Sequence, residues 1–151
     1  DYAHSPVSLE NFFKALPQPS GRRIVVFGAC GDRDPAARPD MGTILDEHAD
    51  ILVITNDDPY TESPQAIAAG LMSGIKNKQL NNTIFLIFDR RTAIRKALSH
   101  ATEKDLVCVL GKWAEQWQVI GNKKIPWDDR LVIREELERI LTSSRYSATT
   151  D

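Results

Sequence analysis

Three polar loops of this sequence hold most of the residues that could bind a charged small molecule. They span residues 28–39, 56–62 and 111–118, and each follows a short apolar run that is typical of a buried strand. In open α/β sheets, ligands bind in the crevice outside the carboxyl ends of the parallel strands. We therefore expect the three loops to meet at one crevice.

The first loop, Gly28 to Pro39, is a candidate anion site. Arg33 and Arg38 precede a predicted helix N-terminus, where backbone N–H groups and arginine side chains both favour an anion. The loop matches neither GxGxxG nor the GxxxxGK(S/T) pattern of a triphosphate-binding loop. A solvated loop in which aspartates pair with the two arginines is the alternative on composition alone.

The second and third loops are rich in acids that could recognise an amino group. Asp57 and Asp58 lie beside a predicted helix start, and Glu115 follows the strand that ends at Gly111. A carboxylate accepts hydrogen bonds from an ammonium group, and Tyr60 would add a flat wall or a hydroxyl. Acids at a helix start also make turns and complement the helix dipole, so a local structural role is the alternative.

Strands and helices alternate along the chain, and the strands are continuously apolar. The predicted strands span residues 23–27, 51–55, 83–88 and 105–110, and a small hairpin is predicted at 118–125. The predicted helices span residues 8–16, 39–48, 64–72, 92–101 and 128–141, with Ser8 and Ser63 as N-caps. This pattern is typical of an α/β domain whose mostly parallel sheet carries helices on both faces.

Length, charge and composition bound the class of protein. The chain has 151 residues, a formal net charge of -2 and 42% hydrophobic residues, which fits one globular domain. Neither nucleic acid nor a membrane is an expected partner, because the charge is small and no apolar run could span a bilayer. The N-terminus is polar, shows no signal peptide and lacks a starting Met, so we expect a cytoplasmic protein of which this chain is one part.

Cysteine and histidine usage predicts no metal site. Cys30 and Cys108 lie at or in predicted strands and lack partners at ligand spacing, so we expect buried free thiols. His48 and His100 fall late in predicted helices, where a histidine favours the helix dipole. His4, in the polar N-terminal segment, is the histidine best placed for a functional role.

Six segments, in order and at matching spacing, resemble the motifs of one enzyme family. They are DYAHSP at 1–6, FGACGDRD at 27–34, RPDMG at 38–42, DDPYTE at 57–62, GKWAE at 111–115 and IPWDDR at 125–130. The family is that of the MurE-type Mur ligases, the UDP-N-acetylmuramoyl-alanyl-glutamate ligases that add the third amino acid of the peptidoglycan stem peptide. The resemblance covers about residues 1–141.

The resemblance implies an ATP-dependent amide ligase of three domains. Residues 1–141 would be its C-terminal, Rossmann-like domain, which selects the incoming amino acid, and residues 142–151 a flexible tail. Two domains absent from this chain would complete it. The N-terminal domain would hold the UDP end of the substrate, and the central domain would hold ATP with Mg²⁺. The expected partners are these small-molecule substrates and the chain's own other domains, so the isolated domain is expected to be inactive.

The resemblance also implies roles for individual residues. It places three residues on the nucleotide side, namely Asp1, His4 and Arg33. It places six in the amino-acid pocket, namely Arg38, Asp57, Asp58, Tyr60, Gly111 and Glu115, with Arg38 pairing with the amino-acid carboxylate. It implies no catalytic residue and no metal ligand in this domain.

The sequence departs from the family pattern where the acceptor is selected. Tyr60 stands where an arginine grips the distal carboxylate of diaminopimelate, and Asp58 replaces an asparagine and adds negative charge. These two changes predict L-lysine or a similar basic amino acid as the acceptor. Trp113 and Ala114 alter the pocket wall, and Cys30 replaces a glycine, which leaves two alternatives open: a divergent paralogue with another acceptor, and a binding module without catalysis.

Overall fold

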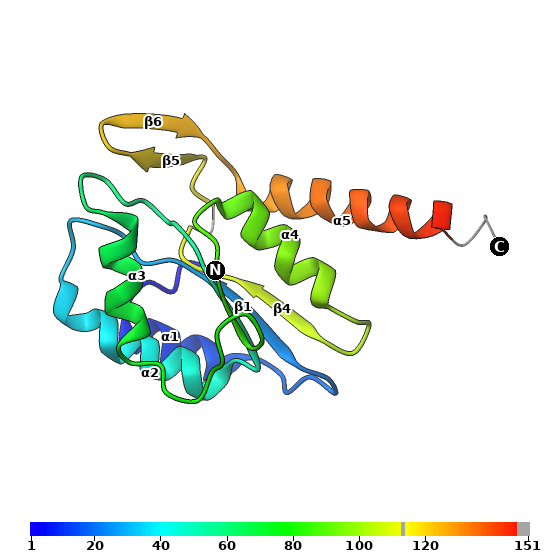
Figure 1. Cartoon of the computed structure of the whole chain (residues 1–151), viewed down its shortest axis with the longest axis horizontal. Coiled ribbons are helices and arrows are strands. Elements are labelled where there is room, and N and C mark those ends of the chain that lie inside the picture. The colour runs from blue at the N-terminus through cyan, green and yellow to red at the C-terminus, as the bar shows by residue number, and fades with distance from the viewer. Residues whose placement is uncertain (113, 148–151) are drawn as a thin grey trace.

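The computed structural model describes residues 1–112 and 114–147, with side chains described as far as residue 143. Within them the elements follow in the order α1 (Pro6–Ala15), β1 (Arg23–Phe27), the 3-10 helix η1 (Pro35–Ala37), α2 (Arg38–His48), β2 (Ile51–Ile54), α3 (Pro64–Met72), β3 (Ile84–Leu86), α4 (Arg90–His100), β4 (Leu106–Val109), β5 (Trp117–Ile120), β6 (Lys123–Pro126) and α5 (Asp129–Ser147). Strands β3-β2-β1-β4 form a parallel sheet in that order, and β5 and β6 form an antiparallel hairpin (Figure 1).

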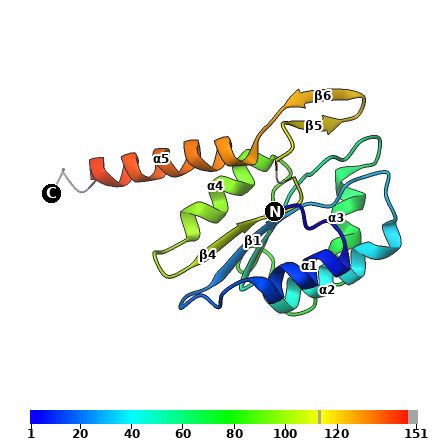
Figure 2. The same ribbon diagram turned by 180° about the vertical axis from the view of Figure 1, so that it is seen from behind.

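Helices cover both faces of the parallel sheet, as the sequence predicted. Helices α1, α2 and α3 lie on one face, and α4 and α5 lie on the other (Figure 2). Val25 and Leu52 point into the core beneath the first group, whereas their neighbours Ile24 and Val53 point into the core beneath the second. Because successive side chains of a strand are buried on opposite faces, the strands can be apolar throughout.

The first helix begins earlier than the sequence predicted. Ser5, and not Ser8, is its N-cap, and Pro6 occupies the first turn. Ser5 accepts the Ser8 backbone N–H, while the Ser8 hydroxyl reaches back to the Ser5 backbone N–H, which completes a capping box. A serine in place of the usual glutamate at the third position hid this box from the sequence pattern. The predicted cap of α3, Ser63, is confirmed.

Two more predicted helix boundaries are wrong. Helix α4 begins at Arg90, because Asp89 caps it by accepting the Thr92 backbone N–H. Helix α5 does not end at Leu141 but continues to Ser147, since neither glycine nor proline interrupts the chain there. Residues 148–151 lie outside the described part of the chain. No helix within the described residues is long and apolar enough to cross a membrane.

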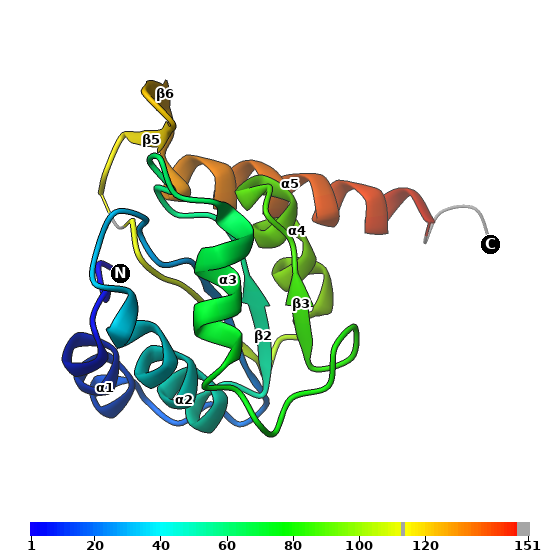
Figure 3. The ribbon, with the colours of Figure 1, turned by 60° about the vertical axis from the view of Figure 1, so that its left-hand side comes forward.

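The three polar loops meet at one edge of the sheet. Strands β1, β2 and β4 run parallel, so their carboxyl ends lie at the same edge, and the β5–β6 hairpin projects beyond it (Figure 3). A single bridge between Tyr60 and Ile120 joins the second loop to the hairpin, and the Gly121 backbone N–H donates to the Tyr60 carbonyl at 2.8 Å. The crevice expected from the strand pattern is therefore present.

Candidate functional site

A cavity of about 430 Å³ lies between the three loops and the N-terminal segment. The residues predicted for the two sides of the site line it together, namely His4, Arg33, Arg38, Asp57, Asp58, Tyr60, Gly111 and Glu115. Asp1 is the exception, because it does not line the cavity. Its carboxylate accepts the Ala3 backbone N–H at 2.8 Å, and its carbonyl accepts the Gly111 backbone N–H at 2.9 Å. Asp1 thus positions the third loop.

The buried ammonium group of Lys112 is at the centre of the acidic side of the cavity. Its side chain is fully buried, and Nζ donates to Asp57 at 3.0 Å, to Asp58 at 2.7 Å and to Glu115 at 3.1 Å. Burial alone would lower the pKa of Lys112, but the charge of Asp57 and the hydrogen bond to Asp58 outweigh it and raise the pKa. Lys112 stays protonated and holds the three acids together.

Sequence reasoning assigned no role to Lys112, although it lies inside a quoted motif. The available signal was a lysine close after a predicted buried strand, together with an Asp-Asp pair close after another predicted strand. Only the strand order β2-β1-β4 brings these loops together, and the order cannot be obtained from a single loop. The structure therefore changes the interpretation of Asp58, because its negative charge pairs with Lys112 of the same domain.

The hairpin fixes the second loop in place. The Val119 backbone N–H donates to Oδ1 of Asp58 at 2.8 Å, and the buried amide of Gln118 donates to the Asp57 carbonyl at 2.7 Å. Gln118 was likewise missed, because the hairpin was predicted as a structural element without a function. With these bonds β5 fixes the carboxylate of Asp58 and the backbone of Asp57.

Arg38 forms a salt bridge with Glu62 inside the domain. It is almost fully buried, and its two terminal nitrogens donate to the two Glu62 oxygens at 2.5 and 2.6 Å. The hydrogen bonds from Arg38 lower the pKa of Glu62 despite its partial burial. Glu62 also accepts the Asp32 backbone N–H at 3.2 Å. A ligand carboxylate could bind Arg38 bidentately only by displacing Glu62.

The cysteine in the cavity wall is a protonated thiol. Burial, together with the negative charges of Asp57 and Asp58, raises the pKa of Cys30 to about 12. A thiol in this state is a poor nucleophile. Cys30 and Cys108 are both free, as the sequence predicted, but only Cys108 is buried, whereas Cys30 is half-buried because it lines the cavity. Trp113, which the sequence placed in the pocket wall, lies outside the described residues.

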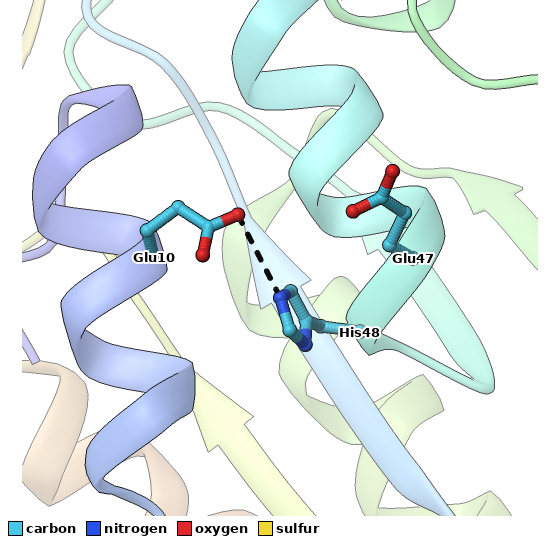
Figure 4. Close-up of side chains that lie close together, drawn as sticks. All are labelled: Glu10, Glu47 and His48. Carbon is cyan, nitrogen blue, oxygen red and sulfur yellow. Dashed lines mark ion pairs between the residues drawn. The ribbon is translucent and has the colours of Figure 1, made fainter.

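A group of potential metal ligands lies away from the cavity. Atoms of Glu10, Glu47 and His48 lie within 4.8 Å of one another on helices α1 and α2 (Figure 4). His48 stacks on the Phe13 ring at 4.8 Å and pairs with Glu10 at 3.8 Å, and Glu10 also pairs with Lys14 at 3.3 Å. The contacts of His48 connect α1 to α2, and together these contacts account for the positions of Glu10 and His48 without a ligand.

Gly111 is expected to tolerate no side chain. Its φ angle is +108°, and a Cβ there would lie 2.8 Å from a carboxylate oxygen of Asp57. We predict that Gly111→Ala lowers the free energy of unfolding by about 2–3 kcal/mol, because the cost of the strained backbone and the cost of displacing Asp57 add together. Gly121→Ala is the control, since Gly121 also has a positive φ, +59°, but nothing within 4 Å, and should cost about 1 kcal/mol. Urea denaturation of both variants measures the difference, and equal losses would contradict the contact with Asp57.

The chain matches one family model, described as the glutamate ligase domain of Mur ligases, over residues 1–113. Two curated relatives, from Caldanaerobacter subterraneus subsp. tengcongensis and Synechocystis sp., are 44% and 46% identical to it over 138 residues, or 91% of the chain. Both are named UDP-N-acetylmuramoyl-L-alanyl-D-glutamate–2,6-diaminopimelate ligases. The chain spans 28% and 27% of their lengths.

A solved structure is also similar. It is described as that of a UDP-N-acetylmuramoyl-L-alanyl-D-glutamate–2,6-diaminopimelate ligase, and it superimposes with a TM-score of 0.85 at 34% sequence identity. The match covers 92% of this chain and 28% of that one. The family model thus matches residues 1–113, and the relatives and the solved structure match more than nine-tenths of the chain.

Proposed function

The chain belongs to the Mur ligase family, and we propose that it is the C-terminal, amino-acid-binding domain of a ligase that adds the third amino acid to UDP-N-acetylmuramoyl-L-alanyl-D-glutamate. In the proposal the domain includes the whole of helix α5 and therefore extends to Ser147, beyond the end expected at residue 141. The complete enzyme has N-terminal and central domains besides it and acts in the cytoplasm on small-molecule substrates.

The observation that carries the proposal is the cavity at the carboxyl edge of the sheet. It brings the acids Asp57, Asp58 and Glu115 together with Arg33 and Arg38 in one space of about 430 Å³. An amino acid has a cation and an anion a few ångströms apart, and such a lining can orient both ends. Holding the amine in one orientation is what this domain contributes to amide formation, because only a positioned amine attacks the activated carboxyl group efficiently.

ATP and Mg²⁺ are placed mainly in the central domain in this proposal. The cavity acids are unsuited to magnesium, because Lys112 Nζ already lies among Asp57, Asp58 and Glu115 where a metal would have to bind. The chain also contains no GxxxxGK(S/T) loop for the phosphates. His4 and Arg33 remain the proposed contacts of this domain with the nucleotide side.

The acceptor we propose is a diamino acid. L-lysine was predicted from two premises, the extra charge of Asp58 and the missing cation at Tyr60. The first is weakened because Lys112 and the Val119 N–H share one Asp58 oxygen. Relatives named as 2,6-diaminopimelate ligases favour a diamino acid with a second carboxylate instead. Lysine and diaminopimelate differ in that carboxylate alone, so their comparison tests the second premise.

We expect the full-length protein to hydrolyse ATP only when UDP-N-acetylmuramoyl-L-alanyl-D-glutamate and a diamino acid are both present. Phosphate release is measured with meso-diaminopimelate, L-lysine and L-norleucine, which matches lysine but lacks the side-chain amine. Equal turnover with norleucine would contradict the role of the acidic cluster. Absence of turnover with all three would favour the divergent paralogue, and a full-length sequence without GxxxxGK(S/T) would favour the binding module.

A further inference from the structure

Three side chains with metal-binding donor atoms lie together outside the cavity. Glu10 comes from helix α1, whereas Glu47 and His48 come from the last turn of helix α2 (Figure 4). One carboxylate oxygen of each glutamate and one imidazole nitrogen of His48 all lie within 4.8 Å of one another. Neither helix supplies all three donors, so the group exists only because α1 packs against α2.

The two carboxylates of this group have little positive charge beside them. Nε2 of His48 lies 3.8 Å from one Glu10 oxygen, which is too far for a hydrogen bond. The other Glu10 oxygen pairs with Lys14, but the Lys14 side chain is 70% exposed, and exposed pairs contribute little. Glu47 is exposed and pairs with no cation in the described part of the chain. A bound cation would therefore relieve the repulsion between the two glutamates.

The imidazole of His48 is held in place before any ligand arrives. Its ring stacks on that of Phe13 in α1, with 4.8 Å between the ring centres and 15° between the ring planes. The His48 carbonyl accepts a hydrogen bond from the buried Arg23 at 3.1 Å, which fixes the end of α2. Donor atoms that packing already positions need little reorganisation to bind an ion.

We propose that Glu10, Glu47 and His48 form a binding site for a divalent transition-metal ion such as Zn²⁺. One imidazole nitrogen and two carboxylate oxygens are ligands that zinc accepts, and water completes its tetrahedral coordination. Two ligands of one tetrahedral zinc ion lie roughly 3.4 Å apart, which is close to the 3.8 Å between His48 and Glu10. The imidazole favours zinc over magnesium, which prefers a shell of oxygen ligands.

The ion has a structural role in this proposal, because it lies outside the cavity and connects α1 to α2. Both helices begin beside the cavity, where Pro6 of α1 and Arg38 of α2 belong to its lining. An ion that connects the two helices therefore stabilises one wall of the cavity without contacting a substrate. The sequence predicted no metal site, because Glu10 lies far from His48 along the chain and only the packing of the helices brings them together.

The test is a calorimetric titration of the 151-residue chain with ZnCl₂ in a buffer that contains millimolar Mg²⁺. Wild type should bind one equivalent of zinc, and Glu47→Gln and His48→Gln should each weaken the binding about 10-fold or more. Glu47→Gln keeps the fold intact, because Glu47 is exposed and forms no ion pair in the described part of the chain. The matched control is His100→Gln, since His100 also ends a helix and contacts a phenylalanine ring, that of Phe85.

Thermal unfolding provides a second readout. A tenfold excess of zinc over its Kd should raise the Tm of wild type and of His100→Gln by about 3–5 °C, and that of Glu47→Gln much less. Three results overturn the inference: no zinc binding by wild type, binding that both Glu47→Gln and His48→Gln leave unchanged, and complete displacement of zinc by Mg²⁺. None of these measurements involves amide formation, so each of these results leaves the proposed ligase function standing.

Discussion

Replacing Lys112 with methionine is expected to lower the free energy of unfolding of this domain by about 3–5 kcal/mol. Methionine fills a similar volume but leaves Asp57 and Asp58 buried without their shared cation. The cost of burying uncompensated charge exceeds the loss of any one hydrogen bond. Urea denaturation followed by circular dichroism at neutral pH measures the change.

The matched control for this variant is Lys14→Met. Lys14 is exposed and forms an i,i+4 pair with Glu10, so its loss should cost less than about 1 kcal/mol. A loss of this small size for Lys112→Met would show that the cluster holds itself together without the lysine. Folded variants should also bind the acceptor poorly, because Glu115 loses its bond to Lys112.

The pH dependence of the Lys112 variant follows from the raised pKa. A group whose pKa is higher in the folded state contributes stability that is fully present below its unfolded pKa and is lost as the pH rises through the folded value. The ordinary value is 10.5 and the folded pKa of Lys112 lies above it. The stability difference between wild type and Lys112→Met should therefore stay constant between about pH 6 and 9 and decrease only in stronger alkali.

The sequence predicted the fold well because each buried strand and each helix of an α/β domain leaves its own pattern of apolar residues within a short segment. Residues 23–27 and 64–72 were predicted with the boundaries that β1 and α3 have. Helix errors fell at the ends of α1, α4 and α5, where one capping side chain or the absence of a breaker decides the boundary. The third strand, predicted over residues 83–88, is confined to Ile84–Leu86. These helix boundaries depend on single contacts, which the spacing of apolar residues does not reveal.

The sequence predicted which residues line the cavity, but it did not predict which of them contact one another. Motif spacing placed Arg38, Asp58 and Tyr60 in one pocket, and the structure brings them together. Their pairing with Glu62, Lys112 and Arg33 depends on which loops become neighbours and on the side-chain geometry there. A charge that a sequence presents as free for a ligand can therefore be neutralised inside the folded protein, as Asp58 shows.

The variant Asp129→Asn is expected to destabilise the domain by about 3–5 kcal/mol, because it leaves the fully buried Arg90 without its counter-charge. Asp129 accepts two hydrogen bonds from Arg90, at 2.8 and 2.6 Å, and one from the Trp127 indole at 2.8 Å. The control is Asp128→Asn, since Asp128 pairs with the exposed Arg130 and asparagine caps a helix equally well. Similar thermal and urea stability for the two variants would contradict the prediction.

The Arg90–Asp129 pair also contacts the backbone of two loops that line the cavity. Arg90 also donates to the carbonyls of Leu110 at 2.9 Å and Asn56 at 3.2 Å, which lie where the third and second loops begin. Burial would raise the pKa of Asp129, but Arg90 outweighs it and lowers the pKa, so this stability is present above the ordinary value of 3.8 and is lost in acid. At neutral pH we therefore expect Asp129→Asn to raise the KM for the acceptor severalfold as well, because both loops lose their common anchor.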